Sequence, residues 1–284
     1  PDFYVAARGH HADIGGITPG SMPANSHHIE EEGVLLDNLL LMRNGEVQEQ
    51  ALRQALATAR YPARNPDQNL ADLKAQLAAC EAGSRELQRL CQRYGTVVVS
   101  DFMKQVQDNA EASLRECLAQ LPSGSFRYDM DDGTRICVRI EVDQQQRSAL
   151  VDFDGSGFVD GERTGLMHPG NFNAPVSVVR AAVLYVFRML VAKPVPLNAG
   201  FLRALDIRVP PASMIAPEYP AAVVSGNVET AQYLVDCLCG ALELMAGSQG
   251  TNNNLTFGNQ RYQYYETLCG GAGASAFGRG ASAV

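Results

Sequence analysis

The sequence has little positive charge and no long apolar run. Its 284 residues include 23 lysines and arginines against 31 aspartates and glutamates, which gives a formal net charge of −8. Nucleic-acid-binding domains usually carry a basic patch, so this balance argues against a nucleic-acid partner. No segment approaches the roughly 20 consecutive apolar residues of a membrane-spanning helix. With 46% hydrophobic and 19% charged residues, the composition is typical of a globular protein, and we expect a small substrate.

Several common motifs are also missing. The chain contains no Gly-x-Ser-x-Gly nucleophile elbow, no phosphate-binding loop ending in Gly-Lys-Ser/Thr, and no dinucleotide-binding fingerprint in its strand–helix setting. Seven cysteines are scattered without a framework spacing, which favours reduced thiols and a cytoplasmic location. No secretory leader is visible, and the chain starts without Met and stops in a glycine-rich stretch. We therefore expect a piece of a longer cytoplasmic polypeptide.

The hydrophobic pattern predicts an α+β fold with mostly antiparallel strands. Apolar and polar residues alternate in three runs over 125–153, and Asp132-Gly133 between two of them is a hairpin signal. Two strongly apolar stretches, 176–192 and 229–246, predict helices buried in the core. Two further strands are expected in the tail.

A long helical hairpin is predicted as an insertion. Leucines recur at helical spacing within residues 66–121, after a helix start at Asn65-Pro66 and with Gly95 as a helix end. This arm would interrupt a catalytic core formed by residues 1–65 and 122–284. Within that core, apolar runs at 3–7 and 34–42 predict two short strands.

One loop near the start of the chain holds four of the five histidines. His10 and Asp13 stand three apart between glycines, and imidazole with carboxylate suits zinc or another divalent metal. The glycines allow the backbone to approach an ion or a substrate closely. The alternative is a set of hydrogen-bonded loop residues. Two ligands do not complete a site, and the candidates for a third are His27, His28, Glu31 and Glu32.

Amide side chains and glycines cluster in three other places. The backbone N–H groups of Gly226–Thr230, at a strand-to-helix junction, are suited to an anion or an oxyanion. Asn227 in that stretch has an alternative role as the helix cap. Asn171 and Asn173 precede a helix and either hold a substrate carboxylate or lactam or only order the turn. The glycines of 270–273 in the tail suit either a substrate or close backbone packing.

Seven blocks in a fixed order give the sequence a family resemblance. Together they resemble the hydantoinase B/oxoprolinase family, with the 5-oxoprolinase branch closest, over almost the whole chain. The blocks read GHHADIGG, PGSMP, EEG (31–33), YPARNPDQNLADLKAQ, GNFNAP, AAVVSGNVET and YYETLCGGAGA.

The resemblance implies an enzyme that works with a hydantoinase A domain or subunit. That partner would bind ATP and Mg and phosphorylate a carbonyl oxygen of the substrate, and the B part would complete the reaction. For a 5-oxoprolinase this is the hydrolysis of 5-oxo-L-proline to L-glutamate. The alternatives are an ATP-dependent hydantoinase, a subunit like those of acetone and acetophenone carboxylases, or a non-catalytic assembly module that docks through its helical hairpin. Homo- or hetero-oligomers are expected in each case.

The resemblance also implies roles for particular residues. His10 and Asp13 match the motif by which the carboxylase branch of the family holds a metal, and we expect them to bind Mn, Zn or Fe, with His11 as a competing choice. Among the candidates for a third ligand, we expect His28. The chemistry of ring opening also requires proton transfer, which we expect at Glu32 or Glu229, and Asn227 is expected as a further catalytic residue. The expected substrate-binding residues are Asn171, Asn173, Gly226 and Gly271.

Overall fold

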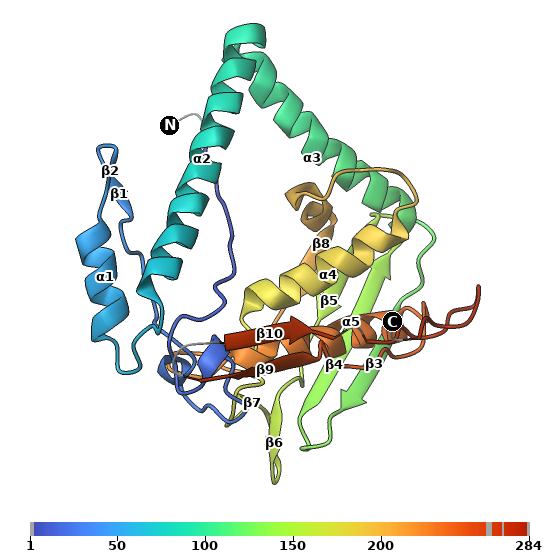
Figure 1. The fold of residues 1–284 in the computed structure, drawn as a ribbon. Helices are drawn as coiled ribbons and strands as arrows, with labels where there is room; N and C mark the ends of the chain where they lie inside the picture. The colour runs from blue at the N-terminus through green and yellow to red at the C-terminus, as the bar shows by residue number, and fades with distance from the viewer. Residues whose placement is uncertain (1–2, 260–262, 269, 283–284) are drawn as a thin grey trace. The chain divides into compact units, whose positions relative to one another are not determined.

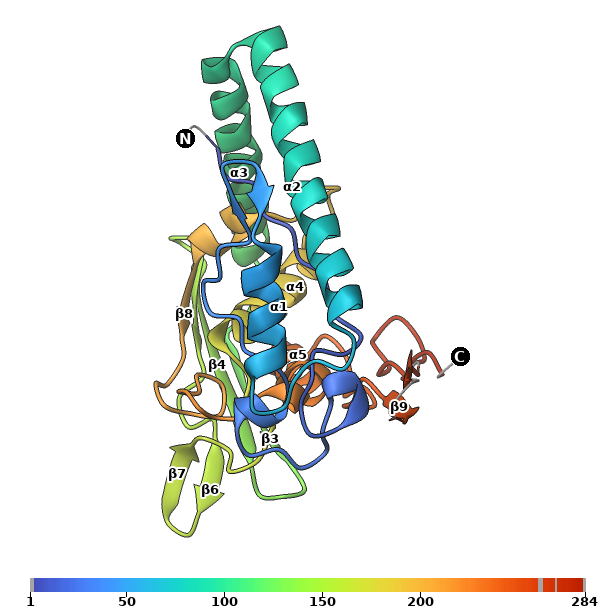
Figure 2. The same cartoon turned by 60° about the vertical axis from the view of Figure 1, so that its left-hand side comes forward.

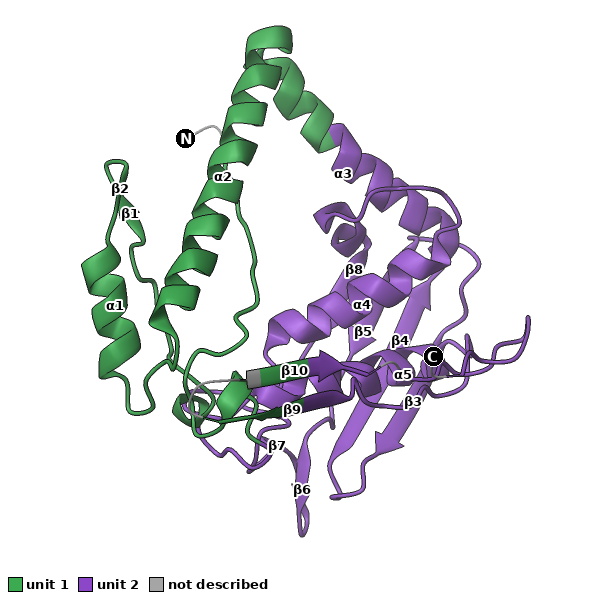
Figure 3. Ribbon diagram, viewed as in Figure 1, with its two compact units in different colours: residues 1–23, 29–104, 256–265 green, residues 24–28, 105–255, 266–284 purple. Residues whose placement is uncertain are grey.

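The computed structural model describes residues 3–259, 263–268 and 270–282, and these fall into two compact units (Figure 3). Unit 1 comprises residues 1–23, 29–104 and 256–265, and unit 2 comprises residues 24–28, 105–255 and 266–284. The division differs from the one drawn from the sequence, because the first helix of the hairpin belongs to unit 1 and the second helix is shared by both units.

Unit 1 is built on two helices, α1 (Glu49–Thr58) and α2 (Pro66–Tyr94), which lie side by side (Figures 1 and 2). A small hairpin of β1 (Met42–Arg43) and β2 (Glu46–Val47) precedes α1. The 3₁₀ turns η1 (Pro19–Ser21) and η2 (Ile29–Glu31) shape the long loop before it. The core of this unit is small and consists of Val34, Leu52, Leu56, Ala63, Leu70 and Leu73.

The predicted ends of α2 are confirmed by its capping geometry. The side-chain oxygen of Asn65 accepts the N–H of Gln68 at 3.2 Å, and Pro66 occupies the first turn. At the other end Gly95 has a φ of 86° and donates its N–H to Cys91 O. The second arm of the hairpin, α3 (Thr96–Leu118), starts directly after this glycine.

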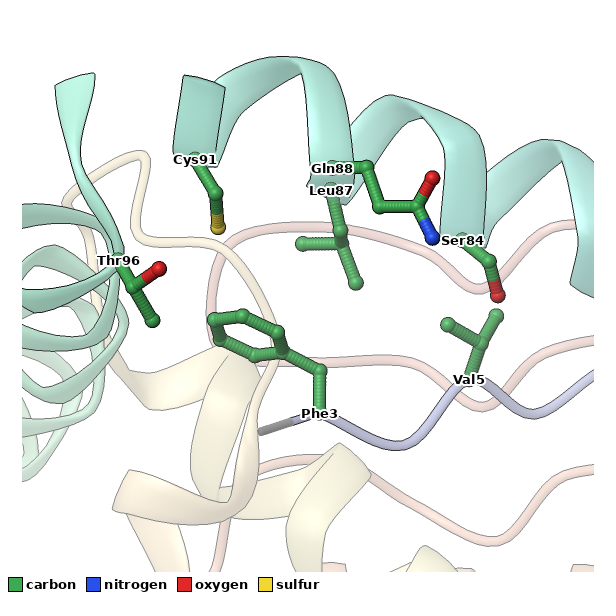
Figure 4. A pocket seen from close by; sticks show the side chains of 7 residues that line it. All are labelled: Phe3, Val5, Ser84, Leu87, Gln88, Cys91 and Thr96. Carbon is green, nitrogen blue, oxygen red and sulfur yellow. The ribbon is translucent and has the colours of Figure 1, made fainter. Parts of the chain in front are cut away.

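The strands predicted at 3–7 and 34–42 are wrong, apart from the last residue of the second. Residues 3–7 form no strand, and Tyr4 is 89% exposed. Phe3 and Val5 instead line a cavity of about 250 Å³ against α2, together with Cys91 (Figure 4). In 34–42 the backbone is irregular up to Leu41, and Val34, Leu36, Leu39 and Leu41 pack in the core of unit 1, whereas Leu35 and Leu40 are exposed. Apolar composition thus predicted burial for only part of the second segment, and a strand also requires a neighbouring strand.

Unit 2 contains the main sheet, whose strand order is β3 (Gly124–Asp129), β4 (Arg135–Asp143), β5 (Ser148–Asp152) and β8 (Leu205–Arg208). The first three strands form the predicted antiparallel meander, and β8 joins β5 in parallel. The two predicted core helices are α4 (Val176–Leu190) and α5 (Ala231–Ala241). They pack with the last turns of α3 against the inward-facing side chains of β4 and β5.

Smaller elements complete the unit. They are the hairpin of β6 (Phe158–Asp160) and β7 (Arg163–Leu166), the 3₁₀ helix η3 (Ala199–Ala204), and the π-helical turn η4 (Gly226–Thr230) that leads into α5. The two strands expected in the tail are β9 (Asn254–Gly258) and β10 (Gln263–Thr267). The α+β class is confirmed. Among the described residues, no helix has the length and apolar character needed to cross a membrane.

Candidate functional site

In unit 1 the histidine-containing loop is organised around the buried carboxylate of Asp13. Its Oδ1 accepts the N–H of Gly15 at 2.9 Å, and its Oδ2 accepts the N–H of Gly20 at 2.8 Å. The Nη1 of Arg64 lies 2.9 Å from the same Oδ2 as an ion pair. Gly15 and Gly16 have φ values of 96° and 86°, a backbone region that favours glycine. The carboxylate therefore fixes a tight loop whose shape requires both glycines.

Arg64 ties this loop to the start of α2. Besides Asp13, its Nη1 donates to Gly15 O at 3.0 Å, and its Nη2 donates to Gly16 O at 2.8 Å. Two carbonyls and one carboxylate oxygen thus hold the guanidinium in one orientation.

The next residues along α2 contact the histidine side of the loop. Asn69, only 1% exposed, donates its Nδ2 to Asp13 O at 2.7 Å. His11 Nδ1 lies 3.2 Å from Asp72 Oδ2, and Gln68 Nε2 donates to Asp72 Oδ1 at 2.8 Å. The Oδ1 of Asn69 is buried and has no hydrogen-bond partner in the part of the chain that the structure describes.

The three residues expected to bind a metal are distributed over both units. His10 is exposed on the loop of unit 1, whereas His28 is exposed in unit 2, where it forms a β-bridge with Ala221. Asp13 already bonds three N–H groups. The described residues contain no group of three or more His, Cys, Asp or Glu side chains that could hold a metal ion. The metal and its three ligands therefore stay a prediction.

In unit 2 the GNFNAP and GNVET motifs pack directly on each other. Ser225 N–H donates to Asn171 O at 3.0 Å, and Thr230 Oγ1 donates to Phe172 O at 2.5 Å. A Cβ on Gly226 would lie 2.2 Å from Asn173 O. Glycine is therefore required at 226 for this close backbone approach, which is the packing role.

The side chains of Asn171 and Asn173 are buried and fully engaged. Asn173 is 0% exposed, its Oδ1 accepts His168 N–H, and its Nδ2 lies within 3.0 Å of three carbonyls, those of His168, Gly170 and Ala222. Asn171 bonds the hydroxyl groups of Ser26 and Ser225. Both amides order the turn in this structure.

The π-helical turn of unit 2 carries two polar side chains that are more accessible than Asn171 and Asn173. Asn227 is exposed, with Ser225 rather than Asn227 at the start of the turn, so Asn227 is not its cap. Glu229 is half-buried, and its Oε1 accepts the hydroxyl of Thr251 at 2.5 Å. Its other carboxylate oxygen bonds no described residue. π-Turns are rare and frequently occur at functional sites.

The two remaining expected site residues are Glu32, in unit 1, and Gly271, in unit 2. Glu32 is 8% exposed in unit 1, and its backbone lies where a Cβ on Gly16 would be. Gly271 in unit 2 bonds both the backbone and the side chain of Gln249: its O accepts Gln249 N–H, and its N–H donates to Gln249 Oε1.

A His–Asp pair in unit 2 was missed in the sequence. His168 Nε2 lies 2.7 Å from Asp132 Oδ2, and His168 Nδ1 accepts Gly170 N–H at 2.9 Å. Burial alone would raise the pKa of Asp132, but hydrogen bonds from the N–H of Thr134, from His168 and from the Thr134 hydroxyl hold it below its ordinary value. Both ring nitrogens are in use, so this pair fastens the loop before Asn171.

Two cysteines of unit 2, Cys237 and Cys239, are buried in the core. The six described cysteines are free thiols, and Cys269 lies outside the described residues. Burial raises the pKa of Cys237 to about 12 and that of Cys239 to about 11, so neither thiol ionises appreciably at neutral pH.

Asn69 and Asp72 lie on the predicted helical hairpin, in which no site residue is expected from the sequence, and Arg64, just before the hairpin, is not among the expected site residues either. A signal was present in the sequence: Asn69 falls on the same face of the helix as Leu73, which is a buried position. A polar residue on the buried face of a helix has to bond something outside that helix.

Two solved enzymes share this fold. The ATP-dependent caprolactamase of Pseudomonas jessenii matches 97% of this chain and 51% of its own with a TM-score of 0.74 at 22% identity. Acetone carboxylase matches 96% of this chain and 39% of its own with a TM-score of 0.72 at 15% identity.

The sequence comparisons define the family. The hydantoinase B/oxoprolinase family model matches residues 1–284, and the chain belongs to this family. It is 41% identical to the 5-oxoprolinase of Dictyostelium discoideum and 39% identical to 5-oxoprolinase 1 of Arabidopsis thaliana, over 99% of its length in both cases. It spans only 22% and 24% of those two proteins.

Proposed function

We propose that this chain is the B part of an ATP-dependent cyclic amide hydrolase of the 5-oxoprolinase type. The reaction would convert 5-oxo-L-proline, ATP and water to L-glutamate, ADP and phosphate. The observation that carries the proposal is the identity of 36–41% to proteins named 5-oxoprolinase from three organisms, over 96–99% of this chain.

The chemistry explains why such a reaction needs two parts. Amide resonance makes the carbonyl of a five-membered lactam a poor electrophile. Phosphorylation of the carbonyl oxygen removes that resonance and creates a leaving group, after which water can attack the carbon. The chain has no Gly-Lys-Ser/Thr phosphate-binding motif, which supports a hydantoinase A partner as the site of ATP and Mg binding. We expect the isolated chain to hydrolyse no ATP.

Glu229 is the carboxylate that we assign to proton transfer in this reaction. Thr251 orients one of its oxygens, and the second bonds no described residue and is available to accept a proton from the attacking water. The neighbouring Asn227 is exposed and can approach the substrate. Glu32 is more deeply buried, and its assignment stays a prediction. So does a divalent metal bound by His10, Asp13 and His28.

The test is a turnover assay with a co-purified hydantoinase A partner. Glutamate release from 5-oxoproline should fall about 100-fold or more in Glu229→Gln, which keeps the Thr251 hydrogen bond but removes the base. Glu162→Gln, an exposed glutamate of the same unit, is the matched control and should keep full activity. Full turnover in Glu229→Gln would remove Glu229 from the mechanism.

Other outcomes separate the alternative functions. Incorporation of labelled bicarbonate into product, without glutamate release, would make the chain a carboxylase component. Release of product from a hydantoin but not from 5-oxoproline would assign it to the hydantoinase branch. Partner-dependent assembly with no turnover of any ring would leave it as a non-catalytic module.

A further inference from the structure

Unit 1 contains a shallow cleft of about 330 Å³, widely open to solvent, beside the glycine loop. This volume falls in the lower range of small-molecule sites. Its lining includes two arginines and no acidic side chain. The lining residues are Gly16, Ile17, Arg60, Tyr61, Pro62 and Arg64.

Arg64 presents unused donors from a fixed position. A guanidinium has five N–H groups, and three of those of Arg64 bond Asp13, Gly15 O and Gly16 O. Its Nε–H and one N–H of Nη2 donate to no residue that the structure describes. These two groups are the donors that bind a carboxylate side-on with two parallel hydrogen bonds. Asp13 and the loop carbonyls already immobilise the guanidinium, so the Arg64 side chain would lose little further conformational entropy when a ligand binds.

Arg60 supplies positive charge that is not neutralised locally. Its guanidinium carbon lies 5.2 Å from the ring centroid of Tyr61, and it forms no ion pair with any described carboxylate. Asp13 balances Arg64, so Arg60 leaves the cleft with an excess of one positive charge. The chain has a net charge of −8, so this cleft is a positively charged region on a negatively charged chain, and it attracts anions.

We infer that this cleft binds the carboxylate of a small anionic substrate. Arg64 donates the two parallel hydrogen bonds from its Nε and Nη2, and Arg60 supplies the second positive charge. The inference rests on the proposed function for the identity of that substrate, the carboxylated five-membered lactam. It makes Arg60 a specificity residue that distinguishes this lactam from rings without a carboxylate.

The test is binding to the 284-residue chain by ligand-observed NMR titration, with no partner and no ATP. 5-Oxoproline should bind, whereas 2-pyrrolidinone, the same ring without the carboxylate, should bind at least about tenfold more weakly. Arg60→Gln should weaken 5-oxoproline binding about tenfold and leave 2-pyrrolidinone unchanged. Arg93→Gln is the matched control, because Arg93 also lies over a neighbouring tyrosine, at 5.1 Å, and it should bind like wild type.

Arg64→Lys, checked for folding by circular dichroism, keeps the positive charge but removes the two parallel N–H donors of the guanidinium. It should also weaken 5-oxoproline binding. Equal binding of the two rings, or equal loss in Arg60→Gln and Arg93→Gln, would overturn the inference. Inorganic phosphate is a separate arm: Arg60-dependent binding of phosphate without binding of 5-oxoproline would overturn the assignment to a carboxylate. Because no turnover is measured, a failure here is distinguishable from a failure of the proposed hydrolase activity.

Discussion

The two units stabilise their motif loops by different chemistry. In unit 1 the glycine loop is held by an ion pair between Asp13 and Arg64, and the arginine keeps two N–H groups without a described partner. In unit 2 the GNFNAP turn is held by neutral amides, and Asn173 uses its Oδ1 and Nδ2 within the protein. A charged anchor with spare donors is suited to binding an ion. A saturated amide anchor is suited to shaping the backbone around it.

The largest effect is expected from the amide anchor of unit 2. Asn173→Ala removes the donor to three carbonyls and the acceptor of His168 N–H in a site with no access to solvent, so it should lower the free energy of unfolding by about 4 kcal/mol. The measurement is urea unfolding followed by circular dichroism. Asn227→Ala, the same change at an exposed position, should stay within about 0.5 kcal/mol. Similar losses in both variants would contradict an anchoring role for Asn173.

The glycine loop of unit 1 should respond next. Gly15→Ala places a Cβ 2.3 Å from Tyr61 O in a residue with a φ of 96°, so we expect a loss of about 3 kcal/mol from clash and backbone strain together. Gly45 has a similar φ of 84° but no atom within 4 Å of a Cβ. Gly45→Ala should therefore cost only about 1 kcal/mol, the strain alone. Thermal unfolding measures the loss in each variant, and the difference between the two losses is the contribution of the steric clash. Equal losses would show that the loop shifts to accommodate the added Cβ of Gly15→Ala.

The ion pair of unit 1 should contribute less than the amide anchor. Asp13→Asn keeps the shape of the side chain but removes the charge that faces Arg64, and we expect a loss of about 2 kcal/mol in denaturant unfolding. Asp67→Asn is the comparison, because Asp67 pairs with Arg53 but has an 82% exposed side chain. Its loss should be within about 0.5 kcal/mol. Equal losses of unfolding free energy in Asp67→Asn and Asp13→Asn would show that burial does not set the contribution of the Asp13–Arg64 ion pair.

The smallest effect concerns the pH dependence of the His168–Asp132 contact in unit 2. The pKa of Asp132 lies below its ordinary value of 3.8 in the folded chain, so its contribution to stability is present above that pH and is lost as the pH falls through the folded pKa. Asp132→Asn should cost about 0.5 kcal/mol at pH 6, because the group is partly exposed. The difference from wild type should shrink towards zero below pH 3.8. Urea unfolding from pH 3 to 6 measures it, with the exposed Asp160→Asn as control. A difference that stayed constant with pH would exclude the charge of Asp132 as its cause.

Local signals in the sequence predicted the regular elements well. Asn65, Pro66 and Gly95 marked the ends of α2, and alternation marked the strands β3, β4 and β5. The strand at 3–7 was predicted wrongly by the same reasoning, since β-pairing depends on a neighbour that the local pattern does not contain. The β5–β8 pairing likewise joins segments about 56 residues apart (Ala149 with Leu205), and no local signal encodes it.

The candidate site divides in the same way. The sequence by itself determined which residue types were available, an imidazole, carboxylate and glycine loop, two amide turns and the GNVET junction, and their order identified the family. Only the tertiary structure decided that Asp13 bonds Arg64, that Asn173 is saturated, and that Arg60 and Arg64 share a cleft. The reason is physical: composition and spacing fix what a side chain can donate or accept, but its partner depends on which distant segment the fold places within hydrogen-bond distance.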